Sequence, residues 1–285
     1  MMQKTRLYQD IFSNRFMEIL PFKERCVMSF KHIVRNILHI VKTFLRPPCF
    51  FREMDVCRAG LFFTFAFLAV IYYHYFMYLV SLIIASYLTG SLPTSIIAGR
   101  LLRGIDIREH GSRNPGATNT FRVLGWKIGV AVGLIDIFKG FFAVWFLARW
   151  IPDDGLIAPD VRLILAGVSV ILGHVFTVFA RFKGGKGVGT AFGVFLGLAP
   201  VPSVAAFALW ILLVWRTGYV SVGSVAAAVV LPALFIVLGL YSENLSVPIT
   251  VLVAAVGLFV IYRHRSNLSR LMRGEENRFN TRRFS

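Results

Sequence analysis

Residues 220–242 read VSVGSVAAAVVLPALFIVLGLYS and contain no charged side chain. As a helix this stretch would be about 35 Å long, enough to cross the roughly 30 Å hydrocarbon core of a bilayer. Further uncharged apolar runs occupy 128–135, 188–215 and 244–262. Such runs predict membrane-spanning helices, so we expect an all-α, polytopic membrane protein.

The composition supports this expectation. Of the 285 residues, 56% are hydrophobic and only 16% are charged, whereas soluble domains average about 45–50% apolar and 25% charged. This excludes an ordinary soluble enzyme, a disordered regulator and a coiled coil. The three cysteines, Cys26, Cys49 and Cys57, form no CxxC pair. We therefore expect no metal site and no thiol nucleophile.

Positive charge is in large excess, with 31 Lys and Arg against 14 Asp and Glu. Cytoplasmic loops of membrane proteins are enriched in Lys and Arg, which explains the excess without nucleic acid as a partner. By this rule 100–127, 181–187, 216–220 and the C-terminal tail are cytoplasmic. The apolar segments between them number seven: 77–99, 128–149, 162–180, 188–199, 202–215, 221–240 and 247–262.

Two of these segments, 188–199 and 202–215, are short, and they flank Pro200 and Pro202. They are either tilted spans or a Pro-broken hairpin that enters the membrane and returns. An odd number of spans places residue 77 outside and the C-terminus in the cytoplasm.

The first 76 residues form a separate, basic extension. Residues 1–58 hold 11 Lys or Arg and five acids, and 60–76 continue without a break into the first segment. Either a tight turn near Tyr72–Tyr75 produces an eighth helix from 60–76, or Met77 is the true start. We divide the chain into this extension and a membrane domain over 77–285.

Three cytoplasmic loops carry the residues suited to chemistry. In the first, GSRNPGATN (111–119) follows GSLPTS (90–95). Its Gly and Pro favour tight turns that leave backbone N–H groups free to bind anions, with the hydroxyls of Ser112 and Thr118 nearby. Arg108 and Arg122 supply planar, two-pronged donors for phosphate or carboxylate.

The second loop contains GGKG (184–187), where glycines let the backbone approach a phosphate and Lys186 supplies charge. The spacing of a Walker A loop is missing, which disfavours an ATPase. His174, at the end of an apolar helix, is better interpreted as a packing or hydrogen-bonding residue than as a base.

The third loop, RHRSNLSRLMRGEE (263–276), places His264 and Asn267 on one helical face. On a continuous helix Glu275 would lie two turns beyond Asn267 on the same side. Within the membrane, Asp136 and Lys139 are three residues apart and are expected to form an internal ion pair.

Six motifs, taken in order, resemble those of the bacterial acyl-phosphate:glycerol-3-phosphate acyltransferases of the PlsY type. They are GS-x-P, GSRNPGATNTFRVLG, D-x-x-KG, FKGGKGV-x-T, YVS-x-x-S and YRHRSNLSRL-x-x-GEE. The resemblance extends from about Met77 to Phe279. It implies seven spanning helices, cytoplasmic active-site loops, a bacterial plasma (inner) membrane location and no cofactor. The implied reaction moves an acyl chain from acyl phosphate to the 1-hydroxyl of glycerol 3-phosphate, the first step of phospholipid synthesis. Partners would be these substrates, membrane lipids and the soluble enzyme that makes acyl phosphate from acyl-carrier protein.

The resemblance also assigns residue roles. The catalytic set it implies is Ser112, Arg122, Lys186, His264 and Asn267. The substrate-binding set is Asn114, Thr118, Asn119, Gly184, Gly185, Gly187 and Ser221. Asp136, Lys139 and Glu275 are expected to be structural. Arg113, Thr177 and Gly189 depart from the family pattern and affect loop shape more than charge.

Chemistry is consistent with this assignment. Acyl phosphate is already activated, so positioning and charge neutralisation can carry the reaction. The proton acceptor is either the substrate's own phosphate or His264. Acyltransferases that use acyl-CoA or acyl-carrier protein with an HxxxxD motif are disfavoured, because no His is followed by Asp five positions on. A transporter of organic phosphates would need polar groups near the bilayer midplane. A membrane scaffold would leave the Gly-rich loops unexplained.

Overall fold

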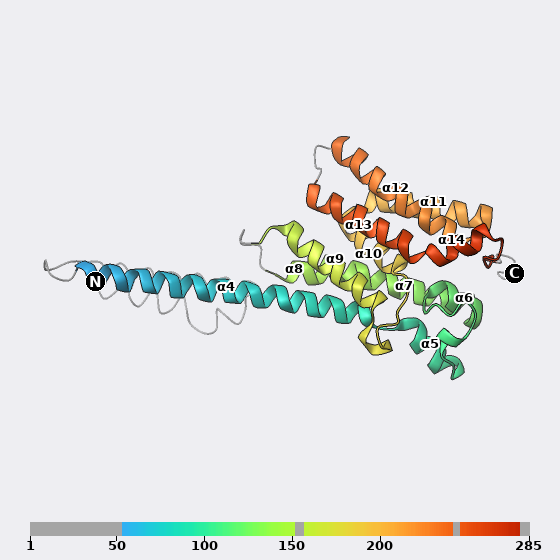
Figure 1. The fold of residues 1–285 in the computed structure, drawn as a ribbon, viewed down its shortest axis with the longest axis horizontal. Coiled ribbons are helices and arrows are strands. Elements are labelled where there is room, and N and C mark those ends of the chain that lie inside the picture. Colours follow the sequence, from blue (N-terminus) through green and yellow to red (C-terminus); the bar gives the residue numbers. More distant parts are fainter. Residues whose placement is uncertain (1–52, 152–156, 242–245, 280–285) are drawn as a thin grey trace, which may run out of the picture. The chain divides into compact units, whose positions relative to one another are not determined.

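The computed structural model describes residues 53–151, 157–241 and 246–279, and all regular structure in these residues is helical (Figure 1). The chain divides into two compact units between Phe76 and Met77. The helices that form the site all belong to the second unit. They are α5 (Thr94–Arg103), α6 (Ala117–Leu124), α7 (Trp126–Phe142), α9 (Pro159–Val175), α10 (Val188–Leu198), α11 (Pro200–Thr217), α12 (Val220–Tyr241), α13 (Val247–Arg263) and α14 (Arg265–Met272).

Helix α4 (Glu53–Ser91) precedes them and runs without interruption. A tight turn near Tyr72–Tyr75, one of our two interpretations of this region, is therefore wrong. The first segment also does not continue unbroken to residue 99. It ends at Ser91, because Pro93 has no N–H to donate and starts a new helix, α5, at Thr94.

Within the described residues, five helical stretches are long and apolar enough to span a membrane: Thr64–Arg103, Trp126–Trp150, Pro159–Ala180, Pro200–Thr217 and Val220–Tyr241. A sixth is obtained if α13 and α14, which meet at a 50° bend, are taken together. The expected segment 188–199 corresponds to α10, whose 11 residues are too few to cross alone. By length, the structure thus supports five or six spans, where the sequence predicted seven.

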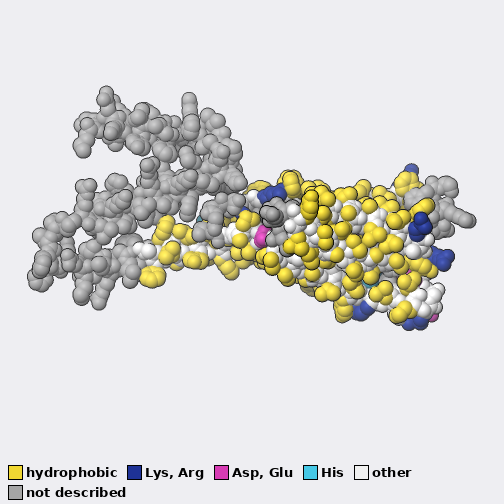
Figure 2. Space-filling model, turned by 90° about the horizontal axis from the view of Figure 1, so that it is seen from above, with side chains coloured by type: hydrophobic (Ala, Val, Ile, Leu, Met, Phe, Trp, Pro, Cys, Tyr) yellow, Lys and Arg dark blue, Asp and Glu magenta, His cyan; other side chains and the backbone are white. Residues whose placement is uncertain are grey.

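The second span includes short elements between α7 and the loop that follows. A π-helical turn, η2 (Ala143–Leu147), joins α7 to α8 (Ala148–Trp150). Two 3-10 turns, η1 (Ile107–Glu109) and η3 (Val178–Ala180), lie in the loops next to α5 and α9. Apolar side chains cover the flank of the helical body, and Lys and Arg gather mainly at the end that bears α6 and α14 (Figure 2).

Two glycines allow helices α7 and α10 to pack with their backbones almost in contact. A Cβ on Gly140 of α7 would lie 2.0 Å from the Thr190 carbonyl oxygen of α10, and one on Gly193 would lie 1.9 Å from that of Ile137. Close packing of this kind is how helices associate in a bilayer, where apolar surface alone gives no driving force. The α7–α10 contact fixes the helix that begins two residues after Lys186.

A buried ion pair connects α7 to the break between α4 and α5. As predicted from their spacing, Lys139 and Asp136 pair, with Nζ 2.8 Å from Oδ1, and both side chains are buried. Lys139 also donates to the Leu92 carbonyl oxygen at 2.9 Å, and Thr94 Oγ1 donates to Asp136 Oδ1 at 2.8 Å. The pair therefore hydrogen-bonds to groups on both sides of Pro93 and ties α7 to the break between α4 and α5.

Candidate active site

A cavity of about 1360 Å³ opens among the loops and continues between the helices. Its outer part is lined by Ser112, Asn114, Thr118, Arg122, Lys186, Ser221, His264, Asn267, Arg270 and Glu276. Its inner part is lined by apolar and small side chains of α10, α11, α12 and α13. We call the first part the polar mouth and the second the apolar depth.

Asn119 organises the first loop and is itself buried. Its amide nitrogen donates to the carbonyl oxygens of Ile107 and His110, and its oxygen accepts from the Ser112 N–H at 2.7 Å. Both polar side-chain atoms are thus hydrogen-bonded inside the protein, and Asn119 also borders the cavity, as expected of the substrate-binding residue that the resemblance implied. Its role in this structure is to hold Ser112 at the cavity.

Arg108 is likewise engaged within the loop. Its guanidinium forms a hydrogen-bonded ion pair with Asp106, with Nη2 2.6 Å from Oδ2. This contact lowers the pKa of the Asp106 carboxyl to about 2. Arg108 Nη1 donates to the Ala180 carbonyl oxygen at 3.2 Å. The pair therefore links the first loop to the second.

The second loop is held from both sides. The N–H groups of Gly184 and Gly185 donate to the carbonyl oxygens of Val175 and His174, which end α9. From the opposite side Arg263 Nη2 donates to the Gly185 carbonyl oxygen at 3.1 Å. Gly187 has φ +83, a conformation that favours glycine, and lets α10 begin two residues after Lys186.

His174, which we expected to pack, is buried behind this loop. Its Nδ1 lies 3.6 Å from Asp136 Oδ1. A Cβ on Gly185 would come within 2.3 Å of His174 Nε2, so any larger residue at position 185 would displace the histidine or the loop. Thus the buried ion pair, His174 and the glycine loop form one packed unit.

His264 stands at the bend between α13 and α14 and is 3% exposed. Its Nδ1 lies 2.8 Å from the Val260 carbonyl oxygen, which can only accept. The Nδ1 therefore carries the proton, and in the neutral ring Nε2 is left as an acceptor at the cavity.

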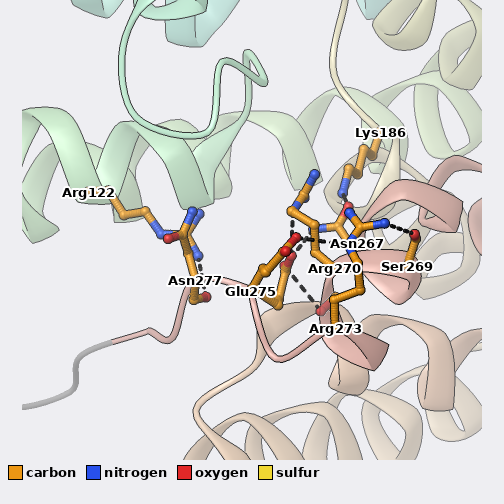
Figure 3. Close-up of polar contacts among 10 residues, drawn as sticks. Arg122, Lys186, Asn267, Ser269, Arg270, Arg273, Glu275 and Asn277 are labelled. Carbon is orange, nitrogen blue, oxygen red and sulfur yellow. Dashed lines mark hydrogen bonds and ion pairs between the residues drawn. The ribbon is translucent and has the colours of Figure 1, made fainter.

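Asn267 joins the second and third loops. Its side-chain oxygen accepts a hydrogen bond from Lys186 Nζ, and its nitrogen donates to Glu276 Oε1 at 2.6 Å. Figure 3 shows Lys186 and Asn267 pointing toward each other from different segments. The Glu276 carboxylate also accepts from Arg270 Nε at 2.9 Å and from Ser221 Oγ at 3.4 Å.

Glu276, which the sequence reasoning passed over, therefore occupies the internal position expected of Glu275. Helix α14 ends at Met272, and Gly274 with φ +73 turns the chain, so positions beyond it no longer follow helical spacing. Glu275 is 58% exposed and pairs with Arg273. The GEE motif contained both candidates, but only the end of α14 decides between them.

Arg122 completes the polar mouth from α6. Its Nη2 donates to the Asn277 carbonyl oxygen at 3.1 Å (Figure 3), and its buried Nε has no hydrogen-bond partner among the described residues. Arg263 Nε is in the same situation. Buried N–H donors without partners are costly unless a ligand satisfies them.

Charge in the mouth is strongly unbalanced. Arg122, Arg263 and Arg270 all act electrostatically on Lys186, against the single carboxylate of Glu276. Burial, assisted by these three cations, lowers the pKa of Lys186 to about 8. Such a cluster, with the N-terminal end of α10 beside it, is suited to bind phosphate.

Fold and site together define a helical membrane protein whose cavity combines an anion-binding mouth with an apolar interior. The family model described as glycerol-3-phosphate acyltransferase matches residues 80–274. Relatives named glycerol-3-phosphate acyltransferase from Chlorobaculum parvum and Chlorobaculum tepidum are 46% and 44% identical, each over 70% of this chain and 95% of the relative.

Two solved structures are also similar. Crystal structures of PlsY, an integral membrane glycerol 3-phosphate acyltransferase, in its glycerol 3-phosphate and lysophosphatidic acid forms, are 35% identical. Their TM-scores are 0.63 and 0.61, over 72% of this chain and 98% and 97% of theirs. The chain belongs to the glycerol-3-phosphate acyltransferase family and is a PlsY-like integral membrane enzyme. This assignment replaces the transporter and scaffold alternatives.

Proposed function

We propose that the acyl donor is acyl phosphate, and that the enzyme transfers its acyl group to the 1-hydroxyl of glycerol 3-phosphate. The products are lysophosphatidic acid and phosphate. The observation that carries this proposal is the single cavity in which Lys186 and Arg122 lie at a mouth continuous with an apolar depth. A substrate with a phosphate head and a hydrocarbon tail matches both parts.

In this reaction the hydroxyl oxygen of glycerol 3-phosphate attacks the acyl carbonyl carbon, and the bond from that carbon to the phosphate oxygen breaks. The leaving phosphate takes the electron pair of that bond. Lys186, Arg122 and the Ser112 hydroxyl are the donors that would neutralise negative charge as it develops. Asn267 would act by holding the Lys186 ammonium in place.

Two acceptors are available for the hydroxyl proton. One is a phosphate oxygen of the substrates, which is adjacent to the reacting atoms by necessity. The other is His264 Nε2, left as an acceptor by the bond from Nδ1 to Val260. Because acyl phosphate is a mixed anhydride, positioning the two substrates removes most of the barrier that a strong base would otherwise lower.

The donor is tested by incubating purified full-length protein with glycerol 3-phosphate and either palmitoyl phosphate, palmitoyl-CoA or palmitoyl-acyl-carrier protein. Lysophosphatidic acid is detected by mass spectrometry. We expect product from palmitoyl phosphate alone. Efficient turnover with either thioester, and none with the phosphate, would refute the proposed donor.

We further propose that the polar mouth faces the cytoplasm of a bacterium with the C-terminus on the same side, where a soluble enzyme can supply acyl phosphate made from acyl-carrier protein. The positive-inside rule supports this orientation. Single cysteines replacing the exposed residues Lys127 and Ala158, in a chain lacking Cys26, Cys49 and Cys57, test it in intact cells. A membrane-impermeant thiol reagent should label position 158 only; labelling of position 127 alone or of both positions would overturn the arrangement.

A further inference from the structure

The apolar depth has a defined direction and a defined end. Helix α10 starts at the polar mouth, α11 returns to it, α12 leaves it again and α13 comes back to end at His264. The order of the helices along the chain therefore shows which end of each helix lies at the polar mouth. The cavity-lining residue farthest from the mouth on each of these helices is, in turn, Phe195, Ser203, Leu231 and Val253.

The separation between mouth and end follows from helix geometry. His264 and Val253 are 11 residues apart on α13, and Ser221 and Leu231 are 10 apart on α12. At 1.5 Å per residue both intervals are about 16 Å. Phe195 and Val253 belong to the buried hydrophobic core, against which Leu231 packs, so this end of the cavity is walled by close-packed side chains.

The chemistry of the depth suits a hydrocarbon and little else. None of its lining residues on α10, α11 or α12 is charged. Its polar groups are satisfied within the protein: Trp210 Nε1 donates to Ser224 Oγ at 3.2 Å, and the hydroxyls of Ser224 and Ser203 donate to backbone oxygens of their own helices. These polar side chains therefore already have hydrogen-bond partners within the protein.

One wall is also stiffened by stacked rings. Phe207 lies between Phe192 and Trp210, with ring centroids 4.7 Å and 5.5 Å away and interplanar angles of 20° and 6°. The Trp210 indole is fixed by its bond to Ser224. A pocket with a rigid wall and a packed end discriminates ligands by length, because it cannot expand to accept additional methylenes.

We infer that Phe195, Leu231 and Val253, which close the apolar depth, set the longest acyl chain that the enzyme accepts efficiently. This inference rests on the proposed function, since it takes acyl phosphate as the donor. It adds a set of specificity-determining residues that lie about three helical turns away from the reacting atoms.

The test uses two substitutions with opposite effects in the full-length protein. Phe195→Ala removes the end wall and should improve kcat/KM for stearoyl phosphate relative to myristoyl phosphate by about tenfold or more. Ala227→Leu fills the depth one turn before Leu231 and should shift the ratio by a similar factor toward shorter chains. Phe138→Ala is the matched control, because Phe138 is 58% exposed and lies outside the cavity lining.

Since Phe195 is in the core, its truncation also costs stability, and thermal unfolding is recorded for each variant. If Phe195→Ala does not fold, the chain-length profile of Ala227→Leu alone tests the inference. A folded, active Ala227→Leu enzyme with the chain-length profile of the wild type would overturn the inference while leaving the proposed reaction intact. If no acyl phosphate is turned over, the proposed donor fails. Length-dependent binding of lysophosphatidic acids by the same variants then separately supports or refutes the subsite.

Discussion

The Asn267 amide nitrogen lies 2.6 Å from the Glu276 carboxylate, and this contact fixes which way the amide faces. With its nitrogen toward Glu276, its oxygen can accept from Lys186. Glu276 is therefore a positioning residue for the phosphate site, although it lies nine residues beyond Asn267 in a segment without regular structure. Its contacts with Asn267 and Arg270 account for a carboxylate among the cations around Lys186.

Glu276→Gln should lower both activity and stability, because an amide cannot accept from Asn267, Arg270 and Ser221 as a carboxylate does. One lost hydrogen bond to a charged group is worth about 1.5–3 kcal/mol. We expect a KM for glycerol 3-phosphate raised by tenfold or more and a lower melting temperature. Glu275→Gln is the control, since that side chain is exposed, and it should behave like the wild type. Equal effects of the two substitutions would contradict the assignment.

Lys186→Met and Arg122→Ala should each reduce kcat/KM by one to two orders of magnitude, the equivalent of one charge-assisted contact of about 1.5–3 kcal/mol. The proteins should stay folded. Lys186→Met should not lower the melting temperature, since it removes a buried cation from a cluster of like charges. Lys127→Met, at an exposed site over Trp126, is the matched control. Near-normal turnover in either site variant would refute the assignment of that residue as a phosphate ligand.

The pKa of Lys186 predicts an alkaline limit. Lys186 is charged below about pH 8 and loses its proton above it, so kcat/KM should be flat from about pH 6.5 to 7.5 and fall by up to tenfold per unit beyond pH 8. The contribution of Lys186 to the free energy of unfolding changes with pH in the opposite direction. Because the pKa falls from 10.5 in the unfolded chain, the charged side chain opposes folding below pH 8, and this cost declines as pH rises.

Lys186→Arg provides the check on this pH dependence, because a guanidinium keeps its charge throughout the range. The variant should be slower at neutral pH but should lose the decline above pH 8. Initial rates at subsaturating glycerol 3-phosphate give the profile directly. A decline with the same midpoint in both enzymes would assign it to another group.

The ion pair of Asp136 and Lys139 should make a large contribution to stability when only one partner is removed. Asp136→Asn leaves a buried ammonium held by carbonyl oxygens alone, and breaking a buried pair costs about 3–5 kcal/mol. The double variant Asp136→Asn with Lys139→Met should be less destabilised than the sum of the single variants. Melting temperatures in detergent form the double-mutant cycle. Additive losses would mean that the two side chains act independently.

The sequence could predict features that depend on local patterns. The alternation of apolar segments with basic loops located the helices from α7 to α13, and the spacing of Asp136 and Lys139 predicted their pairing. Lys186, Asn267 and His264 all line the cavity, as their residue types suggested. Each of these inferences needed only the chemistry of a side chain and its neighbours along the chain.

What the sequence could not give depends on contacts between distant segments. Asn119 was expected to bind substrate, and the sequence did not show that its amide would also hold the backbone of Ile107, His110 and Ser112. Glu276 could not be distinguished from Glu275 without knowing where α14 ends. The bond from Arg263 to Gly185 joins segments 78 residues apart, and no periodicity signals it.

The last prediction concerns the basic N-terminal extension. Every residue that lines the cavity has a number of 100 or above, and the family model begins its match at residue 80. The ion pair that organises the site takes its backbone partners from Gly90 and Leu92, also after Met77. No phosphate-binding contact described above involves residues before 77.

An enzyme beginning at Met77 should therefore insert into the membrane and retain most of its transferase activity. Activity per inserted molecule, measured beside the full-length chain in the same membranes, is the comparison that decides. A properly inserted but inactive Met77 variant would show that residues 1–76 belong to the working enzyme.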